Sequence, residues 1–86
     1  MFKVDNRLAL IEPVLLENGF KELSNNPPTY KNENCRIEVD LENEVFNVSY
    51  RDKNNVNYML TSDNLNLYFL FGFLSANDLV GRNFKL

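Results

Sequence analysis

The sequence predicts an α+β domain, a two-layer sandwich in which an antiparallel β-meander is flanked by an N-terminal and a C-terminal helix. Three patterns predict this fold: an apolar stripe at helical spacing before Gly19, alternation of apolar and polar residues from 35 to 61, and an apolar run over 65–74. The chain has 86 residues and no internal linker, so residues 1–86 are expected to form one domain in the order α-β-β-β-α.

The first helix is predicted from apolar residues that fall on one face, and we expect Asp5 or Asn6 to cap its N-terminus. Gly19 is a stop signal, because glycine readily adopts the left-handed conformation that follows many helices. Phe20 can then fold back onto the last helical turn. The apolar face consists of Leu8, Ile11, Val14 and Leu15.

Pro13 lies inside this predicted helix, where proline removes one backbone hydrogen bond and bends the axis. We favour a single helix that is kinked at Pro13. The alternative keeps residues 2–11 extended and begins a short helix near Glu12.

Three strands are predicted over 35–41, 46–51 and 56–61, because apolar and polar residues alternate there with the strand period of two. The connections between them are short and polar, which implies that consecutive strands are antiparallel neighbours. The face expected to lie beneath the helices carries Ile37, Val39, Leu41, Phe46, Val48, Tyr50, Val56, Tyr58 and Leu60.

The region between the first helix and these strands has weaker patterns. A brief alternation over 20–23 can form a short fourth strand at the sheet edge. Residues 24–28 contain two prolines and are predicted to form a turn, and the polar residues 31–34 are predicted to form a loop.

The second helix is predicted over 65–74, with Ser62 or Asp63 as its cap, and a fourth strand is the alternative for this apolar run. A helix that is apolar all round must be buried all round, whereas one sheet face can cover only one side of it. Either the first helix and the C-terminal residues cover the other side, or a second protein chain does. The side chains predicted to make that contact are Leu67, Tyr68, Phe69, Leu70, Phe71, Phe73 and Leu74.

Enzymatic function is not expected. The chain has no histidine, which removes the commonest general base and the catalytic triads that depend on it. Cys35 is the only cysteine, and its place in the apolar register of a strand indicates a buried structural thiol. Without His or further Cys residues we expect no metal site and no cofactor.

Charge and hydropathy limit the kinds of partner that the chain can be expected to bind. The net charge is −3, and the nine Lys and Arg residues are scattered along the chain, so direct nucleic-acid binding is not expected. The longest apolar run is about half of the roughly 20 residues that cross a membrane. The first residues do not resemble a secretion signal, so a cytoplasmic location is expected. A short acidic stripe, formed by Glu38, Asp40, Glu42 and Glu44, lies on the open sheet face and in the following turn.

The predicted function is a small non-enzymatic interaction module that self-associates or docks to a larger protein through the helix over 65–74. Its size and asparagine-rich composition are compatible with an inhibitor or accessory factor of the kind that phages and mobile elements encode. One alternative is an acidic mimic of nucleic acid that acts on a basic partner through Glu38, Asp40 and Glu42. A second alternative is a small-molecule-binding protein or an enzyme, with a pocket between sheet and helices that uses Tyr50, Tyr58 and the carboxylates.

Overall fold

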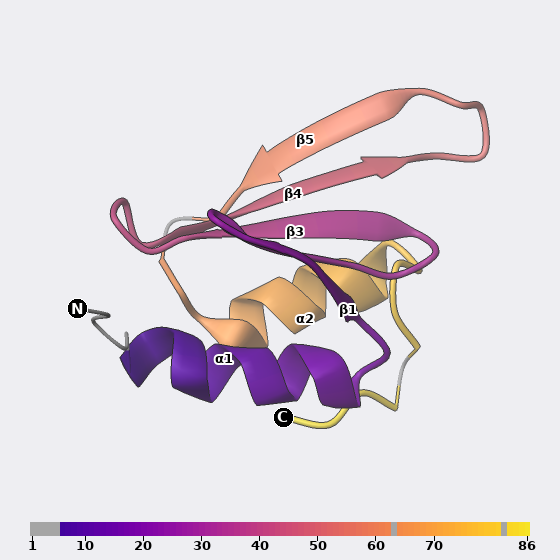
Figure 1. The fold of residues 1–86 in the computed structure, drawn as a ribbon. Coiled ribbons are helices and arrows are strands. Elements are labelled where there is room, and N and C mark those ends of the chain that lie inside the picture. Colours follow the sequence, from indigo (N-terminus) through magenta and orange to yellow (C-terminus); the bar gives the residue numbers. More distant parts are fainter. Residues whose placement is uncertain (1–5, 63, 82) are drawn as a thin grey trace.

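The computed structural model describes residues 6–62, 64–81 and 83–86, and it places a five-stranded antiparallel sheet against two helices (Figure 1). The predicted α+β fold with a helix at each end is confirmed. The sheet has five strands instead of the three or four expected. The elements are α1 (Asn6–Glu17), β1 (Lys21–Asn25), β2 (Pro28–Lys31), β3 (Cys35–Asp40), β4 (Val45–Arg51), β5 (Asn57–Thr61) and α2 (Leu67–Ala76).

The strands follow one another across the sheet in chain order, so β1 and β5 are its two edges. The three predicted strands correspond to β3, β4 and β5. The additional strand β2 falls where a turn and a loop were expected, because its one fully buried apolar side chain, Tyr30, is too weak a signal for alternation. Of the residues predicted as a short edge strand, 21–23 belong to β1, which pairs with β2.

The predicted single helix that contains Pro13 is confirmed. Ile11 and Leu15 are buried, and Leu8 and Val14 pack against the core, so the predicted apolar face is confirmed. Of the two predicted capping residues, Asp5 lies outside the described residues and Asn6 is the first residue of the helix.

Gly19 ends α1 as expected, with a φ of 90°. The N–H of Gly19 donates to the carbonyl of Leu16 at 3.3 Å, and the N–H of Phe20 donates to the carbonyl of Leu15 at 3.0 Å. This pair of bonds is the Schellman arrangement, which satisfies carbonyl groups that the helix leaves free at its end. Phe20 is thereby folded back into the core, where it is buried.

The second helix begins later than predicted. Its cap is Asn66, whose side-chain oxygen accepts hydrogen bonds from the N–H groups of Tyr68 and Phe69 at 2.9 and 3.2 Å. Ser62 instead continues the pairing of β5 with β4, and Asp63 lies outside the described residues. The chain needs the residues after Ser62 to pass from the sheet to the helical layer, and this displaces the helix start.

The core lies between one face of the sheet and the two helices. Phe71 is at its centre: its ring lies 6.4 Å from that of Phe20 and 5.4 Å from that of Phe84, measured between ring centroids. The C-terminal residues are tied to α1, because the Asn18 amide donates to the carbonyl of Lys85 and accepts from its N–H. The buried apolar residues are Ile11, Leu15, Phe20, Tyr30, Cys35, Ile37, Val39, Phe46, Val48, Leu70, Phe71, Leu74 and Leu79.

The prediction that β5 contributes to this core is wrong. Val56, Tyr58 and Leu60 lie on the helix side of the sheet as expected, yet all three are exposed. The two strands beyond β3 move the middle of the sheet away from β5, and the helices cover that middle. Figure 1 shows β5 as the strand farthest from the helical layer.

Candidate functional site: an apolar face between α2 and β5

The two sides of α2 have different surroundings. Leu70, Phe71 and Leu74 are buried in the core, and Leu67 and Phe73 are partly buried. Tyr68 and Phe69 point to solvent and are 76% and 74% exposed. Of the residues predicted to contact a partner, three are therefore buried in the core of the chain itself, and Tyr68 and Phe69 are the most exposed.

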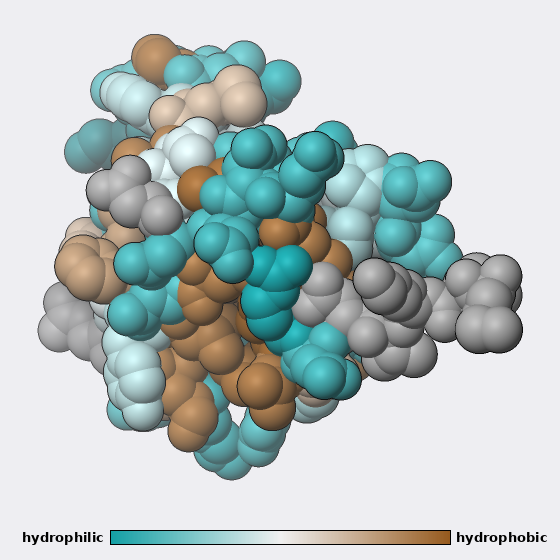
Figure 2. Space-filling model, turned by 90° about the vertical axis from the view of Figure 1, so that its left-hand side faces the viewer, coloured by the Kyte–Doolittle hydropathy of each residue, from teal (hydrophilic) through white to brown (hydrophobic). Residues whose placement is uncertain are grey.

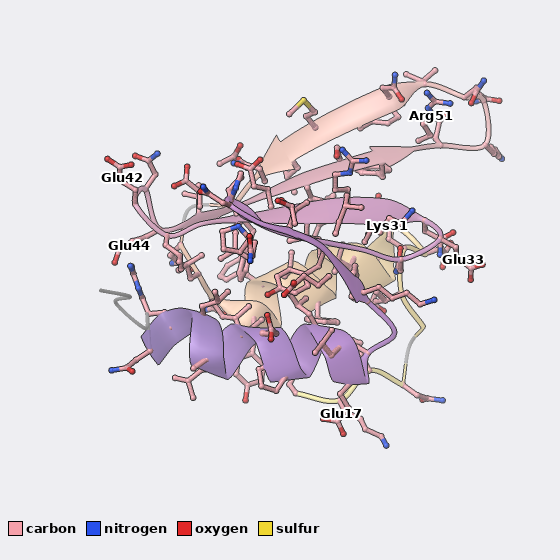
Figure 3. The ribbon with its side chains drawn as sticks, in the orientation of Figure 1. Glu17, Lys31, Glu33, Glu42, Glu44 and Arg51 are labelled. Atoms are coloured by element: carbon pink, nitrogen blue, oxygen red, sulfur yellow. The ribbon has the colours of Figure 1, made fainter. Side chains whose placement is uncertain are left out.

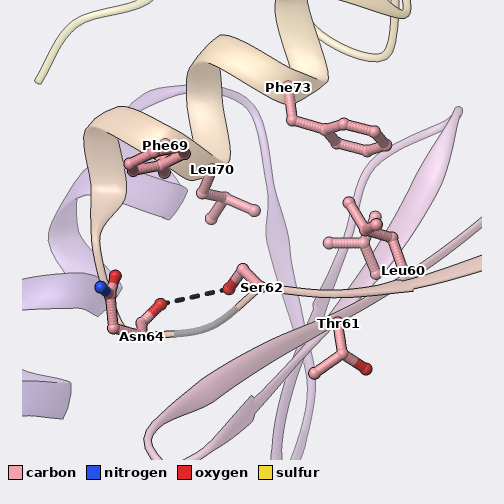
Figure 4. Close-up of a pocket in the computed structure, with 8 residues that line it drawn as sticks. Leu60, Thr61, Ser62, Asn64, Phe69, Leu70 and Phe73 are labelled. Carbon is pink, nitrogen blue, oxygen red and sulfur yellow. Dashed lines mark hydrogen bonds between the residues drawn. The ribbon is translucent and has the colours of Figure 1, made fainter.

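A groove of about 310 Å³ separates α2 from β5 (Figure 4). Phe69, Leu70 and Phe73 form its helix wall, and Leu60 lies on the strand across from them. Its polar groups are few, and one of them is already engaged, because the Ser62 hydroxyl donates to the carbonyl of Asn64 at 3.1 Å. The described residues that line the groove are Val48, Leu60, Thr61, Ser62, Asn64, Phe69, Leu70 and Phe73.

Aromatic contacts extend this apolar surface along the sheet. The ring of Phe73 packs edge-on against Tyr50 with a centroid distance of 6.0 Å, and Tyr50 stacks on Tyr58 at 5.3 Å. Tyr68, Phe69 and Phe73 also line a shallow hollow on the outer side of α2. The resulting surface, here named the α2–β5 face, comprises Val56, Tyr58, Leu60, Tyr68, Phe69 and Phe73.

Apolar residues also gather on the side of the molecule seen in Figure 2, at the height of the helical layer in Figure 1, with hydrophilic residues around them. Apolar residues that gather on the surface and are surrounded by polar ones are typical of surfaces that bind another molecule.

The turn that leads into β5 is organised by Asp52. Its carboxylate accepts hydrogen bonds from the N–H groups of Val56 and Asn54 at 3.0 and 2.9 Å, and from the Tyr58 hydroxyl at 3.1 Å. The bond from Val56 is the main reason why the pKa of the Asp52 carboxyl lies below its usual value. Asp52 therefore fixes both the start of β5 and the ring of Tyr58 on the α2–β5 face.

The predicted acidic stripe is spread out, and most of its members have partners. Glu38 accepts from the Asn47 amide at 3.5 Å, and Asp40 accepts from the side chain and the N–H of Asn43 at 2.8 and 3.0 Å. These bonds from Asn43, the side-chain bond foremost, hold the pKa of the Asp40 carboxyl below its usual value.

The other two acidic residues, Glu42 and Glu44, extend from the loop between β3 and β4 (Figure 3). Glu44 forms an ion pair with Arg7 at 2.8 Å. Within the described part of the chain, no three Asp, Glu or Cys side chains converge in a way that could hold a metal ion.

A row of three cations on the open sheet face was missed at the sequence level. Lys21 lies opposite Lys31 in the β1–β2 pair, and Lys31 lies opposite Arg36 in the β2–β3 pair. No carboxylate of the described residues forms an ion pair with any of the three. The residues are far apart in the sequence, and only the register of the unpredicted strand β2 brings them together.

Replacing Lys31, the central cation of this row, is expected to stabilise the protein. Like charges directly opposite on neighbouring strands repel, whereas opposite charges attract by roughly 0.2–1 kcal/mol per pair. The substitution Lys31→Glu changes two repulsive pairs into attractive ones, so the free energy of unfolding should rise by about 0.5–1 kcal/mol in urea denaturation at low salt.

Lys53→Glu is the matched control, because Lys53 lies in the β4–β5 turn and undergoes the same change of charge outside the row. Added salt should reduce the difference between Lys31→Glu and the wild type, since the repulsion is screened. Equal effects of the two substitutions would show that net charge, not the row, is responsible.

Cys35 is buried, and burial raises the pKa of its thiol to about 12, which makes it a poor nucleophile at neutral pH.

Among the described residues no helix has the length and apolar composition needed to cross a bilayer. Comparisons of the chain with protein-family models, with curated proteins and with solved structures found no match.

Proposed function

We propose that this protein is a small non-enzymatic interaction module that binds another protein chain through the α2–β5 face. The observation that carries the proposal is the exposure of two large aromatic side chains, Tyr68 and Phe69, beside an apolar groove. Tyr and other aromatic residues dominate the energetics of protein interfaces, because they bury a large area and lose little conformational freedom. An inhibitor or accessory factor of a larger protein would have such a face.

The folding of the chain supports this reading. Tyr68 and Phe69 directly precede the buried Leu70 and Phe71 on one short helix, so the core holds the helix in place while its outer side stays exposed. A rigid apolar surface binds with a smaller entropy loss than one that must first be ordered.

A second candidate is a small apolar ligand in the groove. Its volume of about 310 Å³ is at the lower end of the range typical for ligand pockets. The described residues that line the groove are all uncharged, which favours binding over chemistry. The acidic-mimic alternative has less support, because the cations Lys31 and Arg36 share the sheet face with Glu38.

Site-specific photo-crosslinking tests the proposed function. A photo-reactive phenylalanine analogue is placed at Phe69 and, as a control, at Leu10, which is 73% exposed on α1 and lies outside the α2–β5 face. In cells that carry the protein naturally, we expect discrete protein adducts from position 69 and only background from position 10. Equal adduct patterns from both positions would contradict the proposal.

A further inference from the structure

The two edges of the sheet differ in their protection against pairing with another strand. β1 carries the charged residues Lys21 and Glu22, and its register shifts between Glu22 and Ser24. Charges and irregular pairing are the usual devices that keep an edge strand from binding a further strand. β5 has the sequence Asn-Tyr-Met-Leu-Thr, which contains no charge and no proline, and it pairs with β4 in a regular register.

The free hydrogen-bonding groups of β5 can be assigned from its pairing with β4. The bonds Ser62 N–H to Phe46 and Asp52 N–H to Val56 show that Val56 and Ser62 direct their backbone groups toward β4. Because this orientation alternates along an antiparallel strand, the backbone groups of Asn57, Met59 and Thr61 point away from the sheet.

The side chains of two of these residues are already engaged with β4. The Asn57 amide oxygen accepts from Arg51 at 2.8 Å, and the Thr61 hydroxyl donates to Asn47 at 2.8 Å. The outward edge of β5 is therefore a regular ladder of backbone donors and acceptors, with Met59 at its centre, 81% exposed.

We propose that the partner of this edge is a second copy of the chain, which pairs β5 with β5 in antiparallel orientation about a two-fold axis at Met59. The proposal rests on the proposed function and names the occupant of the α2–β5 face. With Met59 on the axis, Asn57 lies opposite Thr61 of the second copy, and every outward backbone group meets a complementary one. The two five-stranded sheets then form one continuous sheet.

The same register matches the side chains on both faces of the sheet. On the helix side, Tyr58 lies opposite Leu60 of the second copy, so two apolar residues that the monomer leaves exposed pack together. On the open side, the polar pair of Asn57 and Thr61 flanks the two Met59 side chains. No charged residue of β5 faces its own copy, although each chain has a net charge of −3.

The exposed apolar residues supply a large part of the area that a dimer interface buries. A free aromatic side chain presents roughly 150–250 Å², and Tyr68 and Phe69 are about three-quarters exposed. Together with Tyr58, Met59 and Leu60, they bring the exposed apolar area to several hundred Å² per chain. A standard interface buries about 800 Å² per partner. Both copies of α2 lie on the same side of the joined sheet, where Phe69 and Phe73 of each copy border a shared groove.

Sedimentation of the full chain across concentration tests the proposal. The wild type should show a concentration-dependent dimer, and Met59→Lys should weaken it at least about tenfold, because it places two like charges opposite each other on the axis. Leu10→Lys is the matched control, since it makes the same kind of change at a similarly exposed apolar residue on α1 and should leave the dimer unchanged.

Cysteine cross-linking tests the register independently. The Cα atoms of residues that face each other across antiparallel strands lie within the range that a disulfide spans. Under oxidation Met59→Cys should form a covalent dimer. Asn57→Cys should form one only when mixed with Thr61→Cys, because those two positions oppose each other. The native thiol of Cys35 is buried and does not interfere.

The outcomes separate this inference from the proposed function. A wild type that remains monomeric at every concentration at which it stays soluble would overturn the self-pairing of β5. A dimer that tolerates Met59→Lys and gives no cross-link at position 59 would overturn it as well. Adducts of unlike proteins at Phe69 in the photo-crosslinking experiment would in that case still support the proposed function.

Discussion

Replacing Phe71 with alanine is expected to remove about 3–5 kcal/mol from the free energy of unfolding, as deletion of a buried aromatic ring generally does. Phe71 is fully buried and contacts the rings of Phe20 and Phe84, so the cavity would open where the helix, the loop after α1 and the C-terminal residues meet. Domains of this size have a total stability of only about 5–15 kcal/mol. Urea denaturation followed by circular dichroism measures the change.

The control is Phe69→Ala, two residues away in the same helix, where the ring is 74% exposed. This substitution should change the free energy of unfolding by no more than about 0.5 kcal/mol. Equal losses for the two substitutions would mean that α2 packs against the sheet in a different rotation, and the α2–β5 face would then be wrong.

Alkaline pH is expected to destabilise the protein from about pH 9 upward. Burial raises the pKa of the Cys35 thiol from 9.0 to about 12. Burial also raises the pKa of Tyr30 above its ordinary value, and the hydrogen bond that its hydroxyl donates to Glu12 contributes to this.

Below pH 9 the thiol is protonated in both the folded and the unfolded chain, so its contribution to stability does not change. Above pH 9 the unfolded chain loses this proton while the folded chain keeps it. Stability therefore falls as the pH rises, by at most about 1.4 kcal/mol per pH unit for one group.

Cys35→Val separates the two groups, because valine keeps an apolar side chain at this strand position and has no proton to lose. In this variant the decline should begin near pH 10, where free tyrosine titrates, instead of near pH 9. Thermal unfolding from pH 7 to 11 measures the onset. The same onset in both proteins would show that the thiol of Cys35 is accessible to water.

The parts of the fold that were predictable are those in which many residues repeat the same signal. In β3 and β4 every second residue is apolar, and the inward residues from Ile37 to Val48 are indeed buried. The end of α1 was predictable because glycine readily adopts the positive φ that follows many helices, and Gly19 does so here. The strand β2 was not, because a four-residue strand with one fully buried apolar side chain does not produce a period.

The sequence located the candidate site on the second helix, but it did not show which side chains of that helix are buried and which are exposed. The run over 65–74 holds more apolar residues than one sheet face can cover, and this identified α2 as the helix with an exposed side. Which side is exposed depends on how α2 is rotated against the sheet, and its uniform hydrophobicity leaves that rotation unspecified. The exposure of β5 depends on the two additional strands, which no local pattern near β5 reveals.

The hydrogen bonds between Asn18 and Lys85 have a consequence for the folding of the chain. Residues 67 positions apart are joined there by two hydrogen bonds, and Leu79 and Phe84 complete the core beside Phe71. The core is therefore complete only when segments from both ends of the described chain have packed together. Contacts between residues so far apart in the sequence form late and slow the folding of a domain, compared with a fold built from local contacts.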